Sequence, residues 1–211
     1  MPEQVQTSCP VIVMAKAPRP GYAKTRLIPT LGAQGAALLA HRLLQHALAQ
    51  AAAAGLGDVD LCCAPDADDA LFAPWSGPDI RFSDQGAGDL GQRMSNAFAR
   101  WLPQTGQALL MGTDCPGISA NVLRLAANAL AQTDAVFVPA LDGGYALIGL
   151  RGCNAARFAT LFKDMQWSHA GVMATTRQRL AGAGLAHHEL PALPDIDEPA
   201  DLQHLPAGWL A

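Results

Sequence analysis

The sequence predicts an α/β fold in which a mixed, mostly parallel β-sheet carries helices on both faces. Short apolar runs recur along the chain, and helical stretches long enough for crossovers separate most of them. Half of the residues are hydrophobic and only 15% are charged, a composition that suits strands buried on both faces. Right-handed crossovers would then bring the carboxyl ends of the parallel strands to one edge of the sheet, where ligands bind.

The apolar runs give the order of the expected elements. Strands are expected at residues 11–15, 59–63, 80–82, 108–111, 135–139 and 145–150, with another around His187 and His188. Helices are expected at 33–54, 91–102 and 119–132, and Gly55 and Gly57 end the first of them. Only a short turn separates 135–139 from 145–150, so these two strands should be antiparallel.

Length and charge limit the class of protein. We expect one domain over residues 1–211, with 1–9 as a disordered or loosely held N-terminus. No signal peptide or membrane span is visible, which predicts a cytoplasmic protein. A net charge of -4 gives no support for a nucleic-acid or membrane partner. The oligomeric state stays open.

Cysteine and histidine show no metal-binding pattern. The five cysteines lack paired spacing and are expected to be reduced and mostly buried. Cys115 lies in a functional-looking turn, but packing explains it better than nucleophilic catalysis. The six histidines form no zinc motif.

The strongest local signal is a basic loop after the first predicted strand, with four of the fourteen basic residues in positions 16–26. No carboxylate lies between Glu3 and Asp58 to neutralise it. Lysine and arginine together suit phosphate oxygens, and glycine allows a close backbone approach. The alternative is a solvated surface loop, and the loop lacks the P-loop pattern. The residues assigned to phosphate are Lys16, Arg19, Gly21, Lys24, Thr25 and Arg26, with Lys24 and Arg26 also assigned to catalysis.

A lone carboxylate, Asp114, follows the fourth predicted strand between a glycine and a proline. A carboxylate at a strand end facing a phosphate loop suits Mg²⁺, or Mn²⁺ in its place, because Mg²⁺ binds few protein oxygens beside phosphate and water. Asp114 is therefore assigned to catalysis and metal binding. The alternative is a cap for the following helix, although Ser119 is the better N-cap candidate.

A second acidic segment lies near the C-terminus. In an extended chain Asp195 and Asp197 face the same side, and together they can complete a metal site. Asp197 can instead cap a helix that starts at Glu198 and Pro199. Both roles can coexist across the pair.

Three weaker signals concern the remaining substrate contacts. The glycine-rich stretch 86–91, followed by Gln92 and Arg93, either approaches a base or ribose or is a flexible loop before a helix. A turn at 142–145 and a Trp at 167 line an acceptor pocket or serve as an ordinary turn and a core residue. The residues assigned on these grounds are Gly88 and Asp89 for the nucleotide, and Asp142, Gly143, Gly144, Tyr145 and Trp167 for the substrate pocket.

Taken in order, these segments resemble a bacterial family of transferases with the GT-A type of nucleotide-binding fold, described as glycosyltransferases of arsenosugar or radical-SAM and selenium-associated gene neighbourhoods. The resemblance runs nearly end to end through KAPRPGYAKTRL, GAGDLGQRM, LLMGTDCPGIS, VPALDGGYALIGL, QWSHAGVMATTRQRL and DIDEPADL. His169 departs from the small polar residue that the family has after its Trp-Ser pair.

The family is similar in turn to guanylyltransferases of molybdenum-cofactor and deazaflavin-cofactor biosynthesis, which share the Lys-[Ser/Thr]-Arg-Leu loop and the closing acidic segment. The resemblance implies a single-domain GT-A fold. It also implies that Lys24 and Arg26 hold phosphates, that Asp114 is the main metal ligand, and that Asp195 or Asp197 completes the site.

Three functions remain. The basic loop slightly favours nucleotidyl transfer from a nucleoside triphosphate to a phosphorylated small-molecule acceptor. The family favours glycosyl transfer from a nucleotide-sugar, although Asp114-Cys115-Pro116 stands where an Asp-x-Asp motif is expected. The third is a nucleotide-binding protein without turnover. Fold alone does not choose among them.

Overall fold

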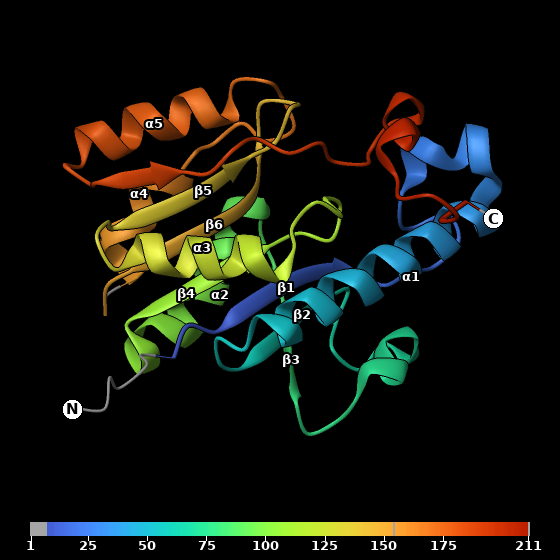
Figure 1. The fold of residues 1–211 in the computed structure, drawn as a ribbon, viewed down its shortest axis with the longest axis horizontal. Helices are drawn as coiled ribbons and strands as arrows, with labels where there is room; N and C mark the ends of the chain where they lie inside the picture. The colour runs from blue at the N-terminus through green and yellow to red at the C-terminus, as the bar shows by residue number, and fades with distance from the viewer. Residues whose placement is uncertain (1–7, 154, 211) are drawn as a thin grey trace.

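A seven-stranded sheet in the order β3-β2-β1-β4-β6-β5-β7 forms the centre of the molecule. We describe it from a computed structural model, which covers residues 8–153 and 155–210 (Figure 1). Within these residues every strand but β6 runs in the same direction. The strands are β1 Val11–Lys16, β2 Val59–Ala64, β3 Ile80–Asp84, β4 Gln107–Met111, β5 Ala135–Pro139, β6 Tyr145–Arg151 and β7 His187–Glu189.

The predicted mixed, mostly parallel sheet is thus confirmed, including the antiparallel pair. β5 and β6 pair antiparallel with Val136 opposite Gly149. A turn as short as the one between them cannot contain a crossover helix, so the chain has to reverse beside itself. β7, which starts at His187, joins the edge of the sheet parallel to β5.

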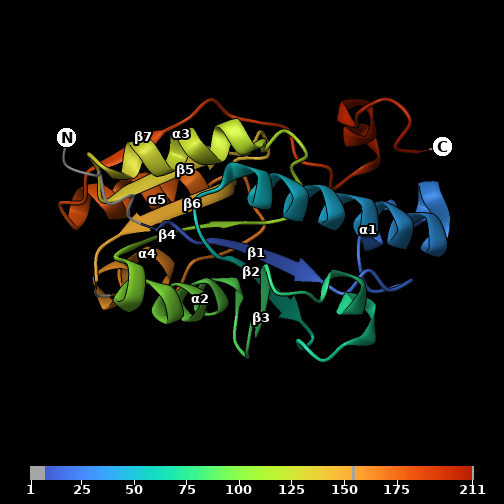
Figure 2. The ribbon, with the colours of Figure 1, turned by 60° about the horizontal axis from the view of Figure 1, so that its bottom comes forward.

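Helices cover both faces of the sheet (Figure 2). One face packs against α1 and α3, and the other against α2, α4 and α5, each over its own hydrophobic cluster. None of the helices in the described ranges is long and apolar enough to cross a membrane. The α-helices are α1 Ile28–Ala54, α2 Leu90–Thr105, α3 Ala120–Leu130, α4 Ala159–Phe162 and α5 Val172–Gly182, and the 3-10 helices are η1 Thr25–Leu27, η2 Ala70–Trp75, η3 Ala155–Phe158 and η4 Pro199–His204.

The C-terminal part of the chain returns to the start of α1. The C-terminal segment lies beside the first turns of α1 (Figure 1), where a third cluster joins Leu27, Leu39 and Leu43 to the fully buried Ile196. Trp209 packs against the same cluster. This contact fixes residues 195–198 next to the loop that follows β1.

Part of the predicted N-terminal segment 1–9 cannot be compared, because residues 1–7 lie outside the described residues. Cys9 is buried, and its N–H donates to the carbonyl of Leu56 at 2.8 Å. The chain is therefore packed against the molecule from this residue on.

The order of the strands places the functional segments. From β1 the chain proceeds to β2 and β3 on one side, and β4 returns to the other side of β1. The direction of winding thus changes between β1 and β4, and a crevice opens at the carboxyl ends of strands at such a point. The basic loop follows β1 and Asp114 follows β4, so the two meet there.

Candidate active site

A cleft of about 820 Å³ lies at the carboxyl edge of the sheet. The segments after β1, β3, β4 and β7 line it, together with the β5–β6 turn and the residues before α5. Three predicted site residues, Arg19, Gly21 and Gly143, do not line it. The predicted residues that do are Lys16, Lys24, Thr25, Arg26, Gly88, Asp89, Asp114, Asp142, Gly144, Tyr145, Trp167, Asp195 and Asp197.

The loop after β1 folds back toward the cleft before α1 begins. Gly21 has a positive φ of 79°, which glycine adopts without a steric penalty. Buried Ala23 and Leu27 anchor the far end of the loop. Arg19 instead turns away, because its guanidinium pairs with Asp69 outside the cleft. Lys16 and Arg26 are the cations of this loop that remain exposed at the cleft.

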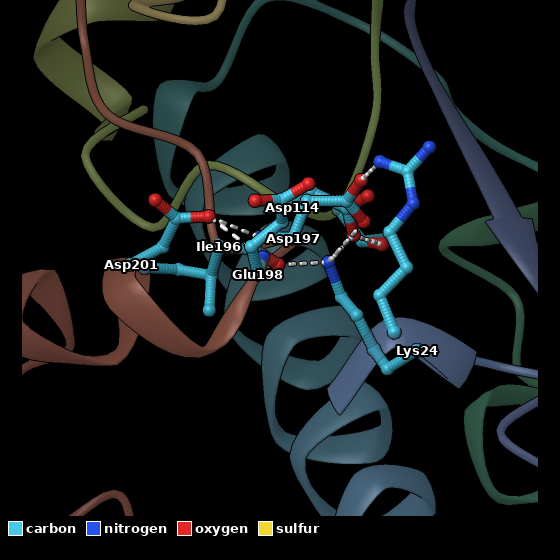
Figure 3. A network of polar contacts seen from close by, with 8 residues as sticks. Lys24, Asp114, Ile196, Asp197, Glu198 and Asp201 are labelled. Carbon is cyan, nitrogen blue, oxygen red and sulfur yellow. Dashed lines mark hydrogen bonds and ion pairs between the residues drawn. The ribbon is translucent and has the colours of Figure 1, made fainter. Parts of the chain in front are cut away.

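Four charged side chains form a chain of ion pairs, Asp114–Lys24–Asp197–Arg26 (Figure 3). The Lys24 Nζ lies 2.7 Å from Asp114 Oδ1 and 3.9 Å from Asp197 Oδ1. Arg26 contacts the other carboxylate oxygen of Asp197. We call these four residues the charge chain. It connects the loop after β1, the loop after β4 and the C-terminal segment.

The buried Lys24 differs from its exposed partners. Its side chain is only 5% exposed, whereas those of Asp114 and Asp197 are 49% and 38% exposed. The ammonium also donates to the carbonyl of Ile196. Lys24 therefore contacts the two carboxylates from the protein interior, and the carboxylates remain accessible from the cleft.

Hydrogen bonds around Asp197 decide between the two roles expected for it. Asp201 Oδ2 accepts the N–H groups of Asp197 and Glu198 at 3.0 and 2.7 Å, so Asp201 satisfies the start of η4. The Asp197 carboxylate is thereby left to the charge chain. Likewise Ser119 caps α3 by accepting from the N–H of Val122, which leaves Asp114 to the cleft.

A second pair of carboxylates lines the other half of the cleft. Burial, and next the charge of Asp142, raise the pKa of the Asp195 carboxyl to about 6. Asp142 is exposed, and its Oδ1 accepts the N–H of Gly144 at 2.8 Å, which fixes the β5–β6 turn. This half of the cleft is therefore acidic.

Aromatic rings form a wall in the same half. Tyr145 and Trp167 meet edge to face at 6.4 Å between ring centroids. A side chain at Gly91 would come within 2.9 Å of the Trp167 ring, so the first turn of α2 needs glycine there. The Trp167 Nε1 is buried without a hydrogen-bond partner among the described residues. Trp167 thus both lines the cleft and packs against α2.

The glycine-rich stretch leads directly into α2, which begins at Leu90. Asp89 caps the helix, with its Oδ1 accepting the N–H of Gln92 at 2.8 Å. Gly88 has a φ of 99° and its carbonyl accepts from the Arg93 Nε at 3.1 Å. The Asp89 carboxylate is therefore partly engaged, whereas Arg93 brings a further cation to the cleft.

Gln85 lines the cleft and was not among the predicted residues. It is only 6% exposed, and its Nε2 donates to the carbonyls of Ala15 and Cys62 at 3.1 Å each. Because both partners are acceptors, the amide nitrogen must face the sheet. The signal for it was a long polar side chain directly at the end of a strand.

The cysteines behave as expected for buried thiols. All but Cys153 are buried, and none forms a disulfide. Burial raises the pKa of the Cys115 thiol to about 11, so it is not an activated nucleophile.

The donors present suit a divalent cation that arrives with phosphate. No group of three acidic, histidine or cysteine side chains in the described ranges could hold a metal by itself. Asp114 and Asp197 nevertheless hold a cation between them, the Lys24 ammonium. Mg²⁺ and Mn²⁺ favour such hard oxygens and complete their coordination with phosphate and water.

Comparison with known families gives one match. Residues 47–169 match the sequence model of a family described as uncharacterized protein conserved in bacteria, DUF2064. No curated protein is significantly similar to the chain.

Solved structures share the fold. A candidate nucleotide-diphospho-sugar transferase from Desulfovibrio desulfuricans G20 superposes with a TM-score of 0.83 at 33% identity, over 92% of this chain and 84% of its own. The 4-diphosphocytidyl-2C-methyl-D-erythritol synthase of Anaerococcus prevotii DSM 20548 has a TM-score of 0.60 at 12% identity, over 94% and 96%. Rv0371c of Mycobacterium tuberculosis H37Rv, in complex with manganese, has a TM-score of 0.57 at 19% identity, over 94% of this chain and 98% of its own. The fold is therefore of the GT-A type.

Proposed function

The chain belongs to the bacterial family DUF2064, and from this premise and the geometry of its cleft we propose that it is a metal-dependent transferase acting on a nucleotide-activated small molecule. The observation that carries the proposal is the charge chain at the crevice between β1 and β4. The proposal takes the chain as a single transferase domain.

The phosphates of the nucleotide occupy the half of the cleft that is lined by Lys16, Arg26 and Arg93. Cations placed around a departing phosphate stabilise the charge that develops on it. Asp114, with Asp197 or Asp195, would hold the metal, Mg²⁺ or Mn²⁺, which neutralises the same phosphates when it is bound. The manganese complex of Rv0371c, a protein of the same fold, supports this choice of ion.

The rest of the substrate, which is the sugar in glycosyl transfer or the acceptor in nucleotidyl transfer, lies in the acidic half against Tyr145 and Trp167. Asp142 and Asp195 would repel a second anionic group but accept hydrogen bonds from hydroxyls. This supports transfer of a sugar from a nucleotide-sugar, as in the name of the Desulfovibrio relative. Nucleotidyl transfer is the second candidate, because the cations of the other half also suit a triphosphate.

Thermal stabilisation by ligands separates the candidates. The purified protein is titrated with nucleoside triphosphates and nucleotide-sugars in the presence of Mg²⁺ or Mn²⁺, since a ligand at 100 times its Kd adds about 2.7 kcal/mol. Stronger stabilisation by a nucleotide-sugar than by the matching triphosphate supports sugar transfer, and the reverse supports nucleotidyl transfer. If no nucleotide changes the Tm, the proposed function is wrong.

Replacing Arg26 with Ala is expected to weaken binding of the best nucleotide about tenfold, because a charge-assisted hydrogen bond to phosphate is lost. The Arg26 side chain is 56% exposed, so the fold should persist. Arg81→Ala is the matched control, since Arg81 is 61% exposed on β3 and lies outside the cleft. Calorimetric titration measures both variants, and equal affinities in the two would remove Arg26 from the phosphate site.

A further inference from the structure

Lys24 is the one member of the charge chain whose side chain is almost fully buried. Its side chain is 5% exposed, and its ammonium contacts Asp114, Asp197 and the carbonyl of Ile196. Asp114 Oδ1 and the Ile196 carbonyl lie within hydrogen-bond distance of the ammonium, whereas Asp197 Oδ1, at 3.9 Å, is held by charge alone. Its backbone has a left-handed φ of 52°, uncommon outside glycine, which the surrounding contacts maintain. In this arrangement the ionic partners of the Lys24 ammonium are the two carboxylates.

The carboxylates keep one side open. Asp114 Oδ1 accepts from Lys24 and, at 3.2 Å, from the hydroxyl of Thr113. In the part of the chain that the structure describes, no hydrogen bond or ion pair engages Asp114 Oδ2. Asp114 is 49% exposed, so this oxygen is accessible to a cation entering from the cleft. Lys24 and an entering cation would then share the same carboxylate.

The charge chain is neutral as it stands. Two carboxylates face one ammonium and one guanidinium, each within 3.9 Å of an opposite charge. The cleft is also lined by two further cations, Lys16 and Arg93, and by three further carboxylates, Asp89, Asp142 and Asp195. A divalent cation alone would turn this small excess of negative charge into an excess of positive charge. The phosphates of a nucleotide bring the negative charge that restores the balance.

We propose that Lys24 is a built-in counter-ion for Asp114 and Asp197, so that a divalent cation binds here strongly only together with the phosphates of a nucleotide. Lys24 thereby keeps the two carboxylates together while the cleft is empty and prevents them from binding free metal. When phosphates enter, they provide both the charge that the metal requires and a new partner for the ammonium. The second part of this inference rests on the proposed function, whereas the first concerns the free protein.

The test measures binding of Mn²⁺ alone, by the electron paramagnetic resonance signal of the free ion. The variant Lys24→Met keeps the length of the side chain and removes its charge. It is expected to bind Mn²⁺ about tenfold more tightly than the wild type, because a positive charge beside the carboxylates is lost. Lys163→Met is the matched control, since Lys163 is exposed and lies outside the cleft. This substitution removes the same charge. It should bind Mn²⁺ as the wild type does.

Equal Mn²⁺ affinities in the folded Lys24→Met and Lys163→Met variants would overturn the proposal. If Lys24→Met does not fold, the proposal is tested on the wild-type protein alone. Its Mn²⁺ affinity is expected to rise about tenfold or more in the presence of whichever of GTP, CTP, ATP and UTP binds, and an unchanged affinity would overturn the proposal. If neither these triphosphates nor any nucleotide-sugar binds, the proposed function is wrong, whereas tighter Mn²⁺ binding by Lys24→Met would still support the counter-ion role.

Discussion

Replacing Asp114 with Asn is expected to lower the transfer rate by about 10²-fold or more without unfolding the protein. The amide keeps the size of the carboxylate and an oxygen that can accept from Lys24, so the loop after β4 should keep its position. What is lost is the negative charge that would hold the metal, and a metal supplies several kcal/mol of transition-state stabilisation. The rate is measured with the nucleotide that stabilises the protein best, at saturating metal.

Asp79→Asn is the control for this prediction, because Asp79 is exposed before β3 and outside the cleft. It removes the same charge and should leave the rate unchanged. Full activity of Asp114→Asn would show that the metal, if any, binds elsewhere. A wild-type protein that binds nucleotide but transfers nothing to any acceptor tested would instead favour the third function, a binding protein without turnover.

Replacing Gly143 with Ala is expected to lower the free energy of unfolding by about 2–4 kcal/mol, on the order of 10 °C in Tm. The new methyl group would lie 2.1 Å from the carbonyl oxygen of Ala170, and φ at Gly143 is +92°. The atoms that the methyl group would meet belong to the backbone of Ala170 and not to a flexible side chain. The β5–β6 turn must therefore separate from the start of α5. This separation would break the hydrogen bond, 2.8 Å long, that the N–H of Met173 donates to the Gly143 carbonyl.

Gly144→Ala is the matched control, since its methyl group would meet only the Asp142 carboxylate, at 3.2 Å, and φ is not positive there. Thermal or urea unfolding compares the two variants. A Gly143→Ala protein as stable as the control would mean that the turn does not depend on close contact with Ala170. In that case the acidic half of the cleft would be less rigidly built than the structure indicates.

The sequence predicted the sheet better than the ends of its helices. Each expected strand is present, and the apolar runs of the central strands are buried on both faces. Helix α1 spans Ile28–Ala54, but Gly32 is non-helical with a φ of 69°, so a short helical turn at 28–31 precedes the long helix, which starts after Gly32 as expected. The short turn was not predicted, because proline and glycine together are typical of a loop, and it is held by packing of Leu27 and Leu31 in the third cluster.

Helix α5 was not predicted, because few apolar residues mark its buried side. Val172, Met173 and Leu180 are buried, together with Thr176, whose hydroxyl donates to the carbonyl of Val172. A polar residue within the buried face weakens the periodic signal from which a helix is recognised. The packing against α4 that buries this side of α5 cannot be predicted from the sequence pattern alone.

The residues of the site were predicted from local patterns, but their partners were not. The structure brings Asp114 and Asp197 to the basic loop as expected, yet Lys24 is buried between them and Arg19 pairs with Asp69. Lys24 and Asp197 are far apart in the sequence. The third hydrophobic cluster and the backbone hydrogen bonds of Ile196 to Asp114 and Lys24 bring them together. A local pattern gives the type of side chain, whereas long-range packing decides what it faces.

The most direct test of the account is a crystal structure of the protein grown with Mn²⁺ and the nucleotide that stabilises it best. The anomalous signal of manganese locates the ion independently of the surrounding density. The account predicts an anomalous peak within coordination distance of Asp114 and of a phosphate oxygen, with the phosphates on the side of Arg26. A nucleotide bound elsewhere, or a manganese peak away from Asp114, would contradict it.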